Sequence, residues 1–600
     1  MKKALKPMAF TLALIMSFGV FSISAVANPN GSITRGEFAQ MLWETNGKPE
    51  PGKGCPFTDV DADNAKAIAS LYEKGVVTGY GGGIFGQDDV LTWEMVYVFA
   101  MRNWNLISDN PGAYVGYEDA ASISSWAQNA ASYMFEQGLG AAITYCSPQS
   151  PVTRSEAAAL LTDIKNKEYF KPGGELDVFI ERLASEDRFS GTVAVGKNDS
   201  IIFEGAYGYA NRETGLKMQT KTKINLGSIN KSFTAVAICQ LIQEGKLSYS
   251  DTLETYLPEF AELSKGRITI EQILTHTAGL GNFRTNEEYL RNKDRIFTTE
   301  ELLPYTMMES LLFEPGTDNS YSNSGFVILG AIIERVAQKD YFDYIDQRVF
   351  TPAGMESSTY KYDPNDEGFA KGYIIEGDRN FIDNKELLPP VGCSAGGGYS
   401  TASDMLRFMN ALNNDILLNG SLTELFSSTG TGYGMYRTKV AGKDAIGMSG
   451  GAEGIASSYE IYPEVGYSVA ILTNSDDGFN RVFSEIKRFL LGAAPAPTMR
   501  RGQVEVNGET VETTILTQDD EAFVPLIEIL ETLGANITDE TIRLNNVTLT
   551  ISSDGVTCTI EGETKAVPSR RMMSGGRAMV FAPIHFYIET FGCQIVVLGG

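Results

Sequence analysis

Histidine is almost absent from this chain, which has only two among its 600 residues, His276 and His585. Cysteine is scarce as well, with six residues, and neither a CxxC pair nor a histidine cluster has the spacing of a metal site. Transition metals in proteins favour such imidazole and thiolate ligands. The sequence therefore predicts that the protein binds no metal and needs no cofactor.

Basic residues are outnumbered, with 49 Lys and Arg against 75 Asp and Glu, and the formal charge is −26. Because binding to a phosphate backbone depends on clustered Lys and Arg, nucleic acid is excluded as the main partner. Long apolar runs are lacking after residue 27, where no segment approaches the roughly 20 apolar residues that span a bilayer. We therefore expect no transmembrane anchor in the mature protein.

The first 27 residues have the pattern of a secretory signal peptide. Three lysines precede an apolar stretch over residues 8–26, and small residues at 25–27 form the cleavage site. Cleavage removes those lysines and no acid, so the mature chain begins near Asn28 with a charge of −29. With 43% hydrophobic and 21% charged residues, the remainder is sufficient for several globular domains. Export also permits disulfide bonds.

Three helical segments near the N-terminus begin with similar sequences, each with Thr as the expected N-cap. They are Thr34-Arg35-Gly36-Glu37, Thr92-Trp93-Glu94 and Thr153-Arg154-Ser155-Glu156, which lie 58 and then 61 residues apart. Similar segments at 57–60 and 117–120 precede the last two, and each is followed by an alanine-rich helix and a Gly turn. The pattern predicts a helical repeat with two full copies and one half copy.

These repeats resemble S-layer homology modules over roughly residues 32 to 165, and we assign residues 28–166 to them. The resemblance implies non-covalent attachment to an anionic secondary cell-wall polymer, and hence a secreted protein on a Gram-positive type of cell wall. Arg35 and Arg154 are the candidate polymer contacts, whereas Trp93 replaces the corresponding Arg in the middle copy. The alternative for both arginines is an ordinary surface charge at a helix start.

A segment of different composition follows, and we assign residues 167–492 to one domain. An amphipathic helix near 175–186 leads into alternating strands at 191–196 and 201–205, which predict a hairpin. The segment ends with a strand at 467–474 and a helix at 479–491. We expect an α/β domain whose antiparallel sheet combines strands from both ends of the segment and is flanked by helices.

The candidate chemistry starts at Ser228, in Gly227-Ser228-Ile229-Asn230-Lys231, just before a helical run. At a helix start the backbone N–H of Ser228 is free to donate to an oxyanion, and Lys231 lies on the same face three residues later. A free lysine has a pKa of about 10.4 and rarely accepts a proton at neutral pH. Because desolvation can lower this pKa by about 3 to 5 units, we predict a buried Lys231 that acts as the base. A capping Ser followed by a surface Lys is the alternative.

Further motifs follow in a fixed order, and each lies beside a predicted helix. They are Ile273-Leu274-Thr275-His276-Thr277-Ala278-Gly279-Leu280, Tyr321-Ser322-Asn323, and Ser394-Ala395-Gly396-Gly397-Gly398-Tyr399-Ser400-Thr401. Together with the Ser228 motif they resemble the serine β-lactamase and penicillin-binding family, in its class C, D,D-peptidase and esterase branch, over residues 174 to 491.

This resemblance implies a role for each matching residue. Ser228 attacks a carbonyl to give an acyl-enzyme, and Lys231 and Tyr321 share the proton transfers. Asn323 orients Lys231 and the substrate amide. His276 is expected to brace the fold beside the site, because its motif lies on a loop between helices; a half-buried aromatic is the alternative for Tyr321.

The family's third motif falls at Met448-Ser449-Gly450-Gly451, which we predict to be the strand that lies along the substrate. The backbone N–H groups of Gly451 and Ser228 would form the oxyanion hole. Met448 replaces the family's cationic or imidazole residue and supplies no charge for a substrate carboxylate. This departure counts against efficient β-lactam hydrolysis and carboxypeptidase action.

The same residues, Gly447-Met448-Ser449-Gly450-Gly451, also fit the GxSxG elbow of α/β-hydrolases. That fold needs a histidine downstream of the serine, and only His585 follows, in another predicted domain. We therefore reject a Ser-His-Asp triad at Ser449.

Residues 493–502 are a Pro/Ala linker, and residues 503–600 are strand-rich and internally duplicated. Matching positions such as Pro525 and Pro583, or Gly534 and Gly592, are 58 residues apart. This region resembles the N-terminal domain of copper amine oxidases and predicts a small α+β accessory domain. Each main segment contains two of the six cysteines: Cys55 and Cys146, Cys239 and Cys393, Cys558 and Cys593. Each pair is either a disulfide bond or two buried thiols.

The sequence thus predicts a multidomain, cell-wall-attached serine hydrolase of the β-lactamase and D-alanyl-D-alanine carboxypeptidase family. We expect it to act on D-amino-acid peptides of the peptidoglycan type or on small related amides and esters. A β-lactamase is one alternative. A non-catalytic, wall-bound sensor or adhesin that binds peptides or β-lactams is the other.

Overall fold

A computed structural model of the protein describes most of the chain from residue 29 to residue 598. The stretches left out are 143, 308–309, 377–379, 476–478, 493–497, 519–520, 539–540, 545–546, 553–554, 561–562, 568–569, 575–576 and 592–593. The predicted signal peptide and the first half of the predicted linker lie outside the described residues. By their contacts, residues up to Phe479 and residues from Asn480 form two compact units. No helix among the described residues is long and apolar enough to cross a membrane.

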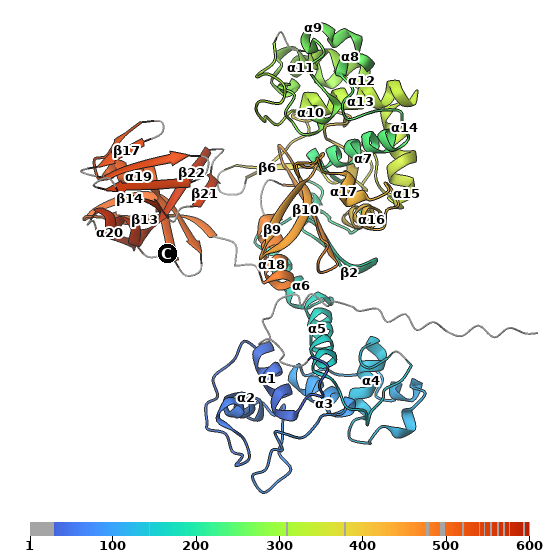
Figure 1. Cartoon of the computed structure of the whole chain (residues 1–600), viewed down its shortest axis with the longest axis vertical. Coiled ribbons are helices and arrows are strands. Elements are labelled where there is room, and N and C mark those ends of the chain that lie inside the picture. Colours follow the sequence, from blue (N-terminus) through green and yellow to red (C-terminus); the bar gives the residue numbers. More distant parts are fainter. Residues whose placement is uncertain are drawn as a thin grey trace, which may run out of the picture. The chain divides into compact units, whose positions relative to one another are not determined.

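Helices and loops make up the N-terminal part of the first unit, drawn in blue to cyan in Figure 1. Thr34 and Thr153 cap their helices as predicted, because each side chain accepts the N–H of the Glu three residues later and that Glu bonds back. Thr92 also stands at a helix start but makes no side-chain cap bond. The helices are α1 (Arg35–Thr45), α2 (Ala62–Glu73), α3 (Trp93–Asn103), α4 (Gln128–Gln137) and α5 (Arg154–Phe170).

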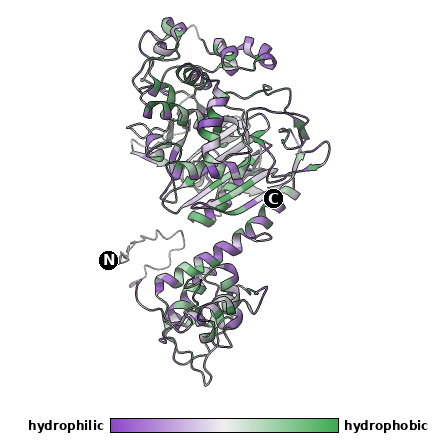
Figure 2. Ribbon diagram, turned by 90° about the vertical axis from the view of Figure 1, so that its right-hand side faces the viewer, coloured by the Kyte–Doolittle hydropathy of each residue, from purple (hydrophilic) through white to green (hydrophobic). Residues whose placement is uncertain are grey.

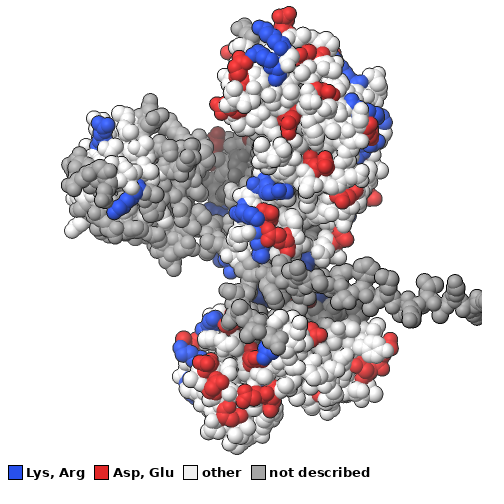
Figure 3. All heavy atoms as spheres, viewed as in Figure 1, with Lys and Arg blue, Asp and Glu red and all other residues white. Residues whose placement is uncertain are grey.

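The three repeat starts pair with one another or with the segments between them. Short antiparallel bridges join Ser32 to Thr153, Thr34 to Val90, and Thr92 to Pro151. The segments joined by these bridges share one hydrophobic core, which includes Phe38, Val96, Ala131 and Leu161. The repeats therefore fold as one cooperative body, as expected for modules that cannot bury their apolar faces alone. On the face shown in Figure 3, acidic side chains outnumber basic ones over this region.

A six-stranded antiparallel sheet forms the centre of the following domain, in the order β2-β1-β12-β11-β10-β9. The predicted hairpin is present, and β1 pairs with β2 on one side and with β12 on the other. Strands from the two ends of the segment therefore meet, as the sequence predicted. The strands are β1 (Gly191–Lys197), β2 (Ser200–Tyr207), β9 (Tyr436–Val440), β10 (Lys443–Ala452), β11 (Ile455–Tyr462) and β12 (Tyr467–Thr473).

The middle strands β11 and β12 are buried along their whole length. β12 reads as a mostly apolar run, as expected for a strand buried on both faces, whereas β11 also buries the polar residues Ser457, Ser458 and Glu460. Helix α16 (Ala402–Asn413) packs against β12 and β1, and α6 (Glu175–Ser185) packs against β2. Figure 2 shows the hydrophobic residues, in green, gathered in the strands of this sheet.

Most of the remaining helices gather beyond one side of the sheet, in green and yellow in Figure 1. The apolar helix α13 packs against α7, and both have long buried stretches. The N-terminal ends of these two helices carry the predicted catalytic motifs. Their bounds, with those of neighbouring elements, are α7 (Asn230–Gln243), α10 (Ile270–Leu274), α11 (Glu287–Asn292), α12 (Thr299–Leu302), α13 (Asn323–Ala337) and α14 (Tyr341–Ile345).

The second unit starts within α18 (Phe479–Leu491) and is rich in strands. One sheet has the order β21-β22-β15-β14-β13-β23, and the other runs from β16 to β20. Besides β15 and β22, the strands are β13 (Thr498–Val506), β14 (Glu509–Gln518), β16 (Asn536–Ile537), β17 (Thr541–Leu544), β18 (Val547–Ser552), β19 (Gly555–Ile560), β20 (Glu563–Val567), β21 (Arg570–Ser574) and β23 (Ile595–Leu598). The predicted duplication is visible in its helices. Pro525 ends β15 (Glu521–Pro525) before α19 (Leu526–Thr532), and Pro583 ends β22 (Arg577–Pro583) before α20 (Ile584–Phe591). The two strands pair antiparallel, with Pro525 opposite Phe581 and Pro583 opposite Phe523, so the copies meet at equivalent strands.

Candidate active site

Two glycines bring the Ser228 turn directly against the edge of strand β10. Ser228 lies in a 3-10 turn (Gly227–Ile229) that leads directly into α7, so it stands just before the helix, as the sequence predicted. Gly227 has a φ of +53°, and a Cβ at this position would lie 2.9 Å from the carbonyl carbon of Gly450. A Cβ on Gly450 would lie 2.8 Å from the backbone nitrogen of Ser228. Only glycine fits at either position, because a side chain would push the serine turn off the strand.

Lys231 is completely buried beneath Ser228, with none of its surface exposed to solvent. Its Nζ lies 3.2 Å from Ser228 Oγ, 2.7 Å from Asn323 Oδ1 and 2.5 Å from the backbone oxygen of Ala395. The structure therefore brings Ser228, Lys231 and Asn323 together, as the sequence predicted. The contact with the Ala395 carbonyl was not predicted.

Burial is the main reason that the pKa of Lys231 falls from its ordinary 10.5 to about 7; Cys393 opposes this shift, and the positive charge of Arg284 supports it. A neutral amine has two N–H bonds and one lone pair. Asn323 Oδ1 and the Ala395 oxygen each accept one of the two N–H bonds. The lone pair is then left for the hydroxyl proton of Ser228, which is the requirement for a general base.

Tyr321 and Asn323 come from the start of α13, which Ser322 caps by accepting the N–H of Gly325. Asn323 Nδ2 donates to Asn282 Oδ1 at 3.2 Å, so its amide is held with the oxygen facing Lys231. The Tyr321 ring lies 4.8 Å from Lys231 Nζ. Burial raises the pKa of Tyr321, while a hydrogen bond with Ser228 and the charge of Arg284 lower it. Tyr321 is therefore a protonated hydroxyl in contact with the nucleophile.

His276 contacts the motif of Tyr321 and Asn323 and supports it, as the sequence indicated. Its φ is +61°, and its Nδ1 accepts the backbone N–H of Ser322 at 3.1 Å. Its ring lies 4.7 Å from that of Tyr321 and 5.2 Å from that of Phe326. Burial lowers the pKa of His276 to about 4, and the charge of Lys231 adds to this. The imidazole is therefore neutral at physiological pH and holds Tyr321 in place.

On strand β10, the predicted substrate-strand residues do not all face the site. Gly451 lines the active-site cavity together with Ser228, and Gly450 gives the close approach described above. The Ser449 hydroxyl bonds that of Ser458 at 3.0 Å on the neighbouring strand. Met448 is partly buried against the hydrophobic core and does not line the cavity.

The cavity above Ser228 has a volume of about 410 Å³ and contains groups that sequence reasoning missed. Arg284 and Glu453 form an ion pair on its wall, and Cys393 lies beside them. No signal in the sequence distinguished these residues from ordinary loop residues. The apolar part of the wall consists of Phe283, Tyr289, Ile296, Leu302, Leu388 and Val391. No group of three His, Cys, Asp or Glu side chains in the described part of the chain is arranged to hold a metal ion.

A family model described as Beta-lactamase matches residues 176–492, which is more than half of the chain. The chain belongs to the beta-lactamase family. The members of this family are serine hydrolases. The structure thus confirms the predicted fold class of this domain.

Curated relatives of this beta-lactamase-family chain include penicillin-binding proteins. PbpX, a penicillin-binding protein of Bacillus subtilis, is 31% identical over 264 residues, which is 43% of this chain and 63% of the relative. Protein flp of Staphylococcus aureus is 29% identical over 218 residues, covering 36% and 43% of the two chains. The matched region therefore spans less than two thirds of either relative. An octameric penicillin-binding protein homologue from Pyrococcus abyssi has the same fold, with a TM-score of 0.51, 21% identity and coverage of 68% and 100%.

The flanking domains also match family models. Residues 56–90 match the S-layer homology domain, and residues 505–597 match the copper amine oxidase N-terminal domain, as the sequence predicted. An S-layer homology domain indicates association with the cell surface through a secondary cell-wall polymer. All five described cysteines are free thiols, and Cys593 lies outside the described residues.

The two candidate polymer-binding arginines differ in their surroundings. Arg35 is only 5% exposed, and its guanidinium donates to the backbone oxygens of Phe85 and Thr78. It also lies over the rings of Tyr80, Phe85 and Phe99. Arg154 is more accessible and pairs with Glu37 of the first repeat. Arg35 therefore joins parts of the repeat internally, and Arg154 joins the last repeat to the first.

Proposed function

We propose that this protein is an exported, wall-attached hydrolase that forms an acyl-enzyme at Ser228 and acts on D-amino-acid peptides or related amides and esters. One observation carries the proposal. Lys231 Nζ is fully buried within 3.2 Å of Ser228 Oγ, and both of its N–H bonds have other acceptors. This is an arrangement in which the serine hydroxyl is activated without a histidine.

The reaction would proceed in two halves. Neutral Lys231 takes the hydroxyl proton as Ser228 Oγ attacks the substrate carbonyl, and the N–H groups of Ser228 and Gly451 stabilise the oxyanion. Tyr321 and Lys231 then pass the proton to the leaving nitrogen or oxygen as its bond to the acyl carbon breaks. In the second half water attacks the acyl-enzyme, the same groups accept its proton, and the acid is released with Ser228 reprotonated.

The surroundings of Met448 favour substrates without a free carboxylate on the leaving group. Met448 is apolar and packed against the core, so it supplies neither a charge nor a hydrogen bond there. A substrate carboxylate on the leaving group therefore finds no partner at this position of the strand. Small amides and esters are therefore favoured over C-terminal peptide carboxylates and β-lactams, although wall attachment favours peptidoglycan peptides.

Wall attachment is supported by the S-layer homology match at residues 56–90. We extend this module to residues 28–166, because the three repeat starts share one core. Arg154 is the better candidate for a contact with an anionic polymer, since part of its side chain is exposed. Export through the signal peptide at residues 1–27 would place the enzyme outside the membrane.

The proposal is tested by assaying p-nitrophenyl butyrate, a peptide ending in D-Ala-D-Ala, and nitrocefin side by side. We expect turnover of the ester and slow or no turnover of nitrocefin, and none of the activity should survive in Ser228→Ala. Rapid nitrocefin hydrolysis would instead favour a β-lactamase. Absence of all turnover with a stable penicillin adduct at Ser228 would favour a wall-bound sensor, which the apolar Met448 also suits.

A further inference from the structure

An ion pair stands inside the active-site cavity and has no part in the proton transfers proposed above. Arg284 Nη2 donates to Glu453 Oε2 at 2.8 Å. Arg284 belongs to a 3-10 turn (Phe283–Thr285) of the helical half, and Glu453 belongs to the turn between β10 and β11. Both residues line the same cavity as Ser228. The pair therefore connects two different parts of the domain across the space that a substrate enters.

The backbones of both residues are held firmly in place. Asn282 Oδ1 accepts the N–H of Arg284 at 3.2 Å and also bonds Asn323. Asn384 Nδ2 donates to the backbone oxygen of Glu453 at 2.6 Å. Anchored backbones keep the two charges at fixed positions.

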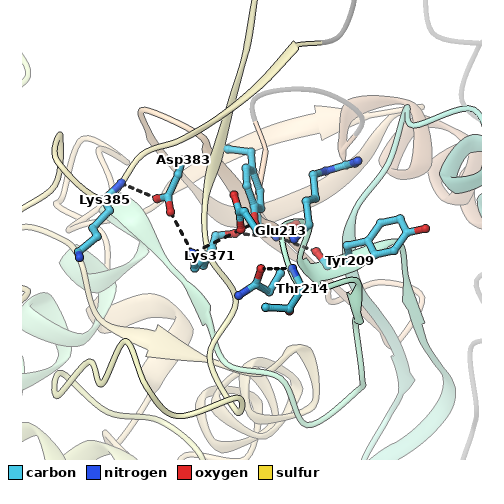
Figure 4. Close-up of polar contacts among 10 residues, drawn as sticks. Tyr209, Glu213, Thr214, Lys371, Asp383 and Lys385 are labelled. Atoms are coloured by element: carbon cyan, nitrogen blue, oxygen red, sulfur yellow. Dashed lines mark hydrogen bonds and ion pairs between the residues drawn. The ribbon is translucent and has the colours of Figure 1, made fainter.

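Asn384 is itself held by a polar network beside it. Lys371 bonds both Glu213 and Asp383, at 3.3 and 3.2 Å, and Asp383 accepts the N–H of Lys385 (Figure 4). Asp383 ends strand β7 (Asn380–Asp383), immediately before Asn384. The network thus fixes the segment that supports Glu453.

The side-chain tips, in contrast, remain accessible. The side chains of Arg284 and Glu453 are 36% and 45% exposed. An ion pair this open contributes about 1 kcal/mol or less, so a ligand can replace it at little cost. A carboxylate from the ligand fits Arg284, whose planar guanidinium binds carboxylates through two parallel bonds. An ammonium from the ligand fits Glu453.

The cavity lies at one end of strand β10. Gly451, Ala452 and Glu453 line it, whereas Met448, in the interior of the strand, does not. The acyl part of a substrate stays attached to Ser228 through both halves of the reaction, while the leaving group departs. This end of the strand, with its apolar wall, is suited to the part that stays.

We propose that Arg284 and Glu453 form a recognition site for the acyl group, selective for acyl chains that end in both a carboxylate and an ammonium. Such a zwitterionic end makes two ion pairs in place of one, and the apolar wall accommodates the chain between it and the carbonyl. An acyl end with a single charge forms one ion pair and also approaches the residue that carries its own sign of charge. An uncharged end covers the Arg284–Glu453 pair and removes water from it without offering either residue a new partner. This inference rests on the proposed function for its biological meaning, but the binding site can be tested without turnover.

The test uses four p-nitroanilides with acyl groups of similar length: butyryl, 4-aminobutyryl, glutaryl and γ-glutamyl. Their binding is measured by calorimetry on the full chain carrying Ser228→Ala, which is independent of whether the protein is a hydrolase. We expect the γ-glutamyl compound, which ends in both charges, to bind on the order of tenfold more tightly than the butyryl compound, equivalent to about 1.4 kcal/mol.

Two further substitutions, each made in the Ser228→Ala protein, separate recognition from a structural role. Arg284→Gln should reduce the advantage of the γ-glutamyl compound over butyryl and leave the unpaired Glu453 to favour the 4-aminobutyryl compound. Glu453→Gln should reduce the same advantage and leave the unpaired Arg284 to favour the glutaryl compound. Arg335 and Glu259 form an exposed pair of similar accessibility outside the cavity, so Glu259→Gln is the matched control and should change none of the ratios. Equal binding of all four compounds, or ratios that neither cavity substitution changes, would overturn the proposal.

Discussion

Lys231 Nζ lies 3.2 Å from Ser228 Oγ, beneath a turn that two glycines hold against strand β10. The amine is shielded from solvent, and Asn323 and Ala395 accept its two remaining bonds. We propose that desolvation here performs the function that a histidine and an aspartate perform in other serine hydrolases. The scarcity of histidine in this chain is consistent with such a site.

The first prediction concerns the pH dependence of ester hydrolysis. The reactive form of Lys231 is neutral, and burial lowers its pKa to about 7. We expect kcat/KM for p-nitrophenyl butyrate to fall as the pH drops through about 7, because protonation removes the base. His276, with a pKa of about 4, remains neutral across this range and does not contribute. A profile that is flat from pH 5 to pH 9 would argue against Lys231 as the base.

A second prediction follows from the charge near Lys231. The positive charge of Arg284 lowers the pKa of Lys231, so Arg284→Gln should move the midpoint of this pH profile upward. The control substitution Arg335→Gln removes an arginine on the outer surface and should leave the midpoint in place. A downward shift in Arg284→Gln would contradict the electrostatic account.

The third prediction uses the left-handed backbone of His276. Asn tolerates a φ of +61° and its Oδ1 can accept the N–H of Ser322, whereas Ala offers no acceptor. We expect His276→Ala to lower kcat by on the order of tenfold, since a buried N–H loses its partner and Tyr321 loses its support. His276→Asn should keep more activity, with an unchanged midpoint in the pH profile. If the two variants lose the same activity, the bracing role assigned to Nδ1 is wrong.

The fourth prediction compares two glycines with positive φ. Gly227→Ala adds a Cβ only 2.9 Å from strand β10, whereas Gly245→Ala adds one with no atom within 4 Å. Both substitutions carry a backbone strain of about 1 to 3 kcal/mol, measurable as a lower free energy of unfolding. Only Gly227→Ala should also abolish most of the activity, because it displaces the serine turn. Full activity in Gly227→Ala would show that the close contact is unnecessary.

The fifth prediction separates the two arginines of the S-layer homology region. Arg35 is buried under three aromatic rings, so Arg35→Ala should destabilise this region by about 2 kcal/mol or more in chemical denaturation. Arg154→Ala should have a smaller effect on stability and should weaken sedimentation of the protein with purified cell walls. If Arg154→Ala sediments like the unchanged protein, Arg154 makes no important contact with the polymer.

Local sequence signals were sufficient to predict much of the fold. The Thr caps at residues 34 and 153 and the β1–β2 hairpin depend on neighbouring residues, and both are present. The Ser228 and Tyr321 motifs were recognisable because their order and spacing resemble those of a known family. The 3-10 turn before α7, where Gly227 packs against Gly450, had no such signal in the sequence.

Tertiary contacts could not be predicted from these signals. The bond from Lys231 to Ala395 spans 164 residues, and the ion pair between Arg284 and Glu453 spans 169. Lys231 and Ala395 each belong to a recognised motif, but nothing in either motif marks them as partners, and Arg284 and Glu453 belong to no motif. The same limit applied to the cysteines, for Cys239 is buried in α7 as a free thiol whose sulfur contacts the Tyr249 hydroxyl. The spacing of the cysteines in the sequence did not decide whether Cys239 is a free thiol or part of a disulfide bond.

The most direct test of the account is to label the protein with a fluorophosphonate at several pH values and locate the label by mass spectrometry. We predict modification of Ser228, at a rate that rises through a midpoint near pH 7 and is lost in Ser228→Ala and strongly reduced in Lys231→Met. Modification of another residue, or equal labelling of Lys231→Met, would contradict the assignment of nucleophile and base.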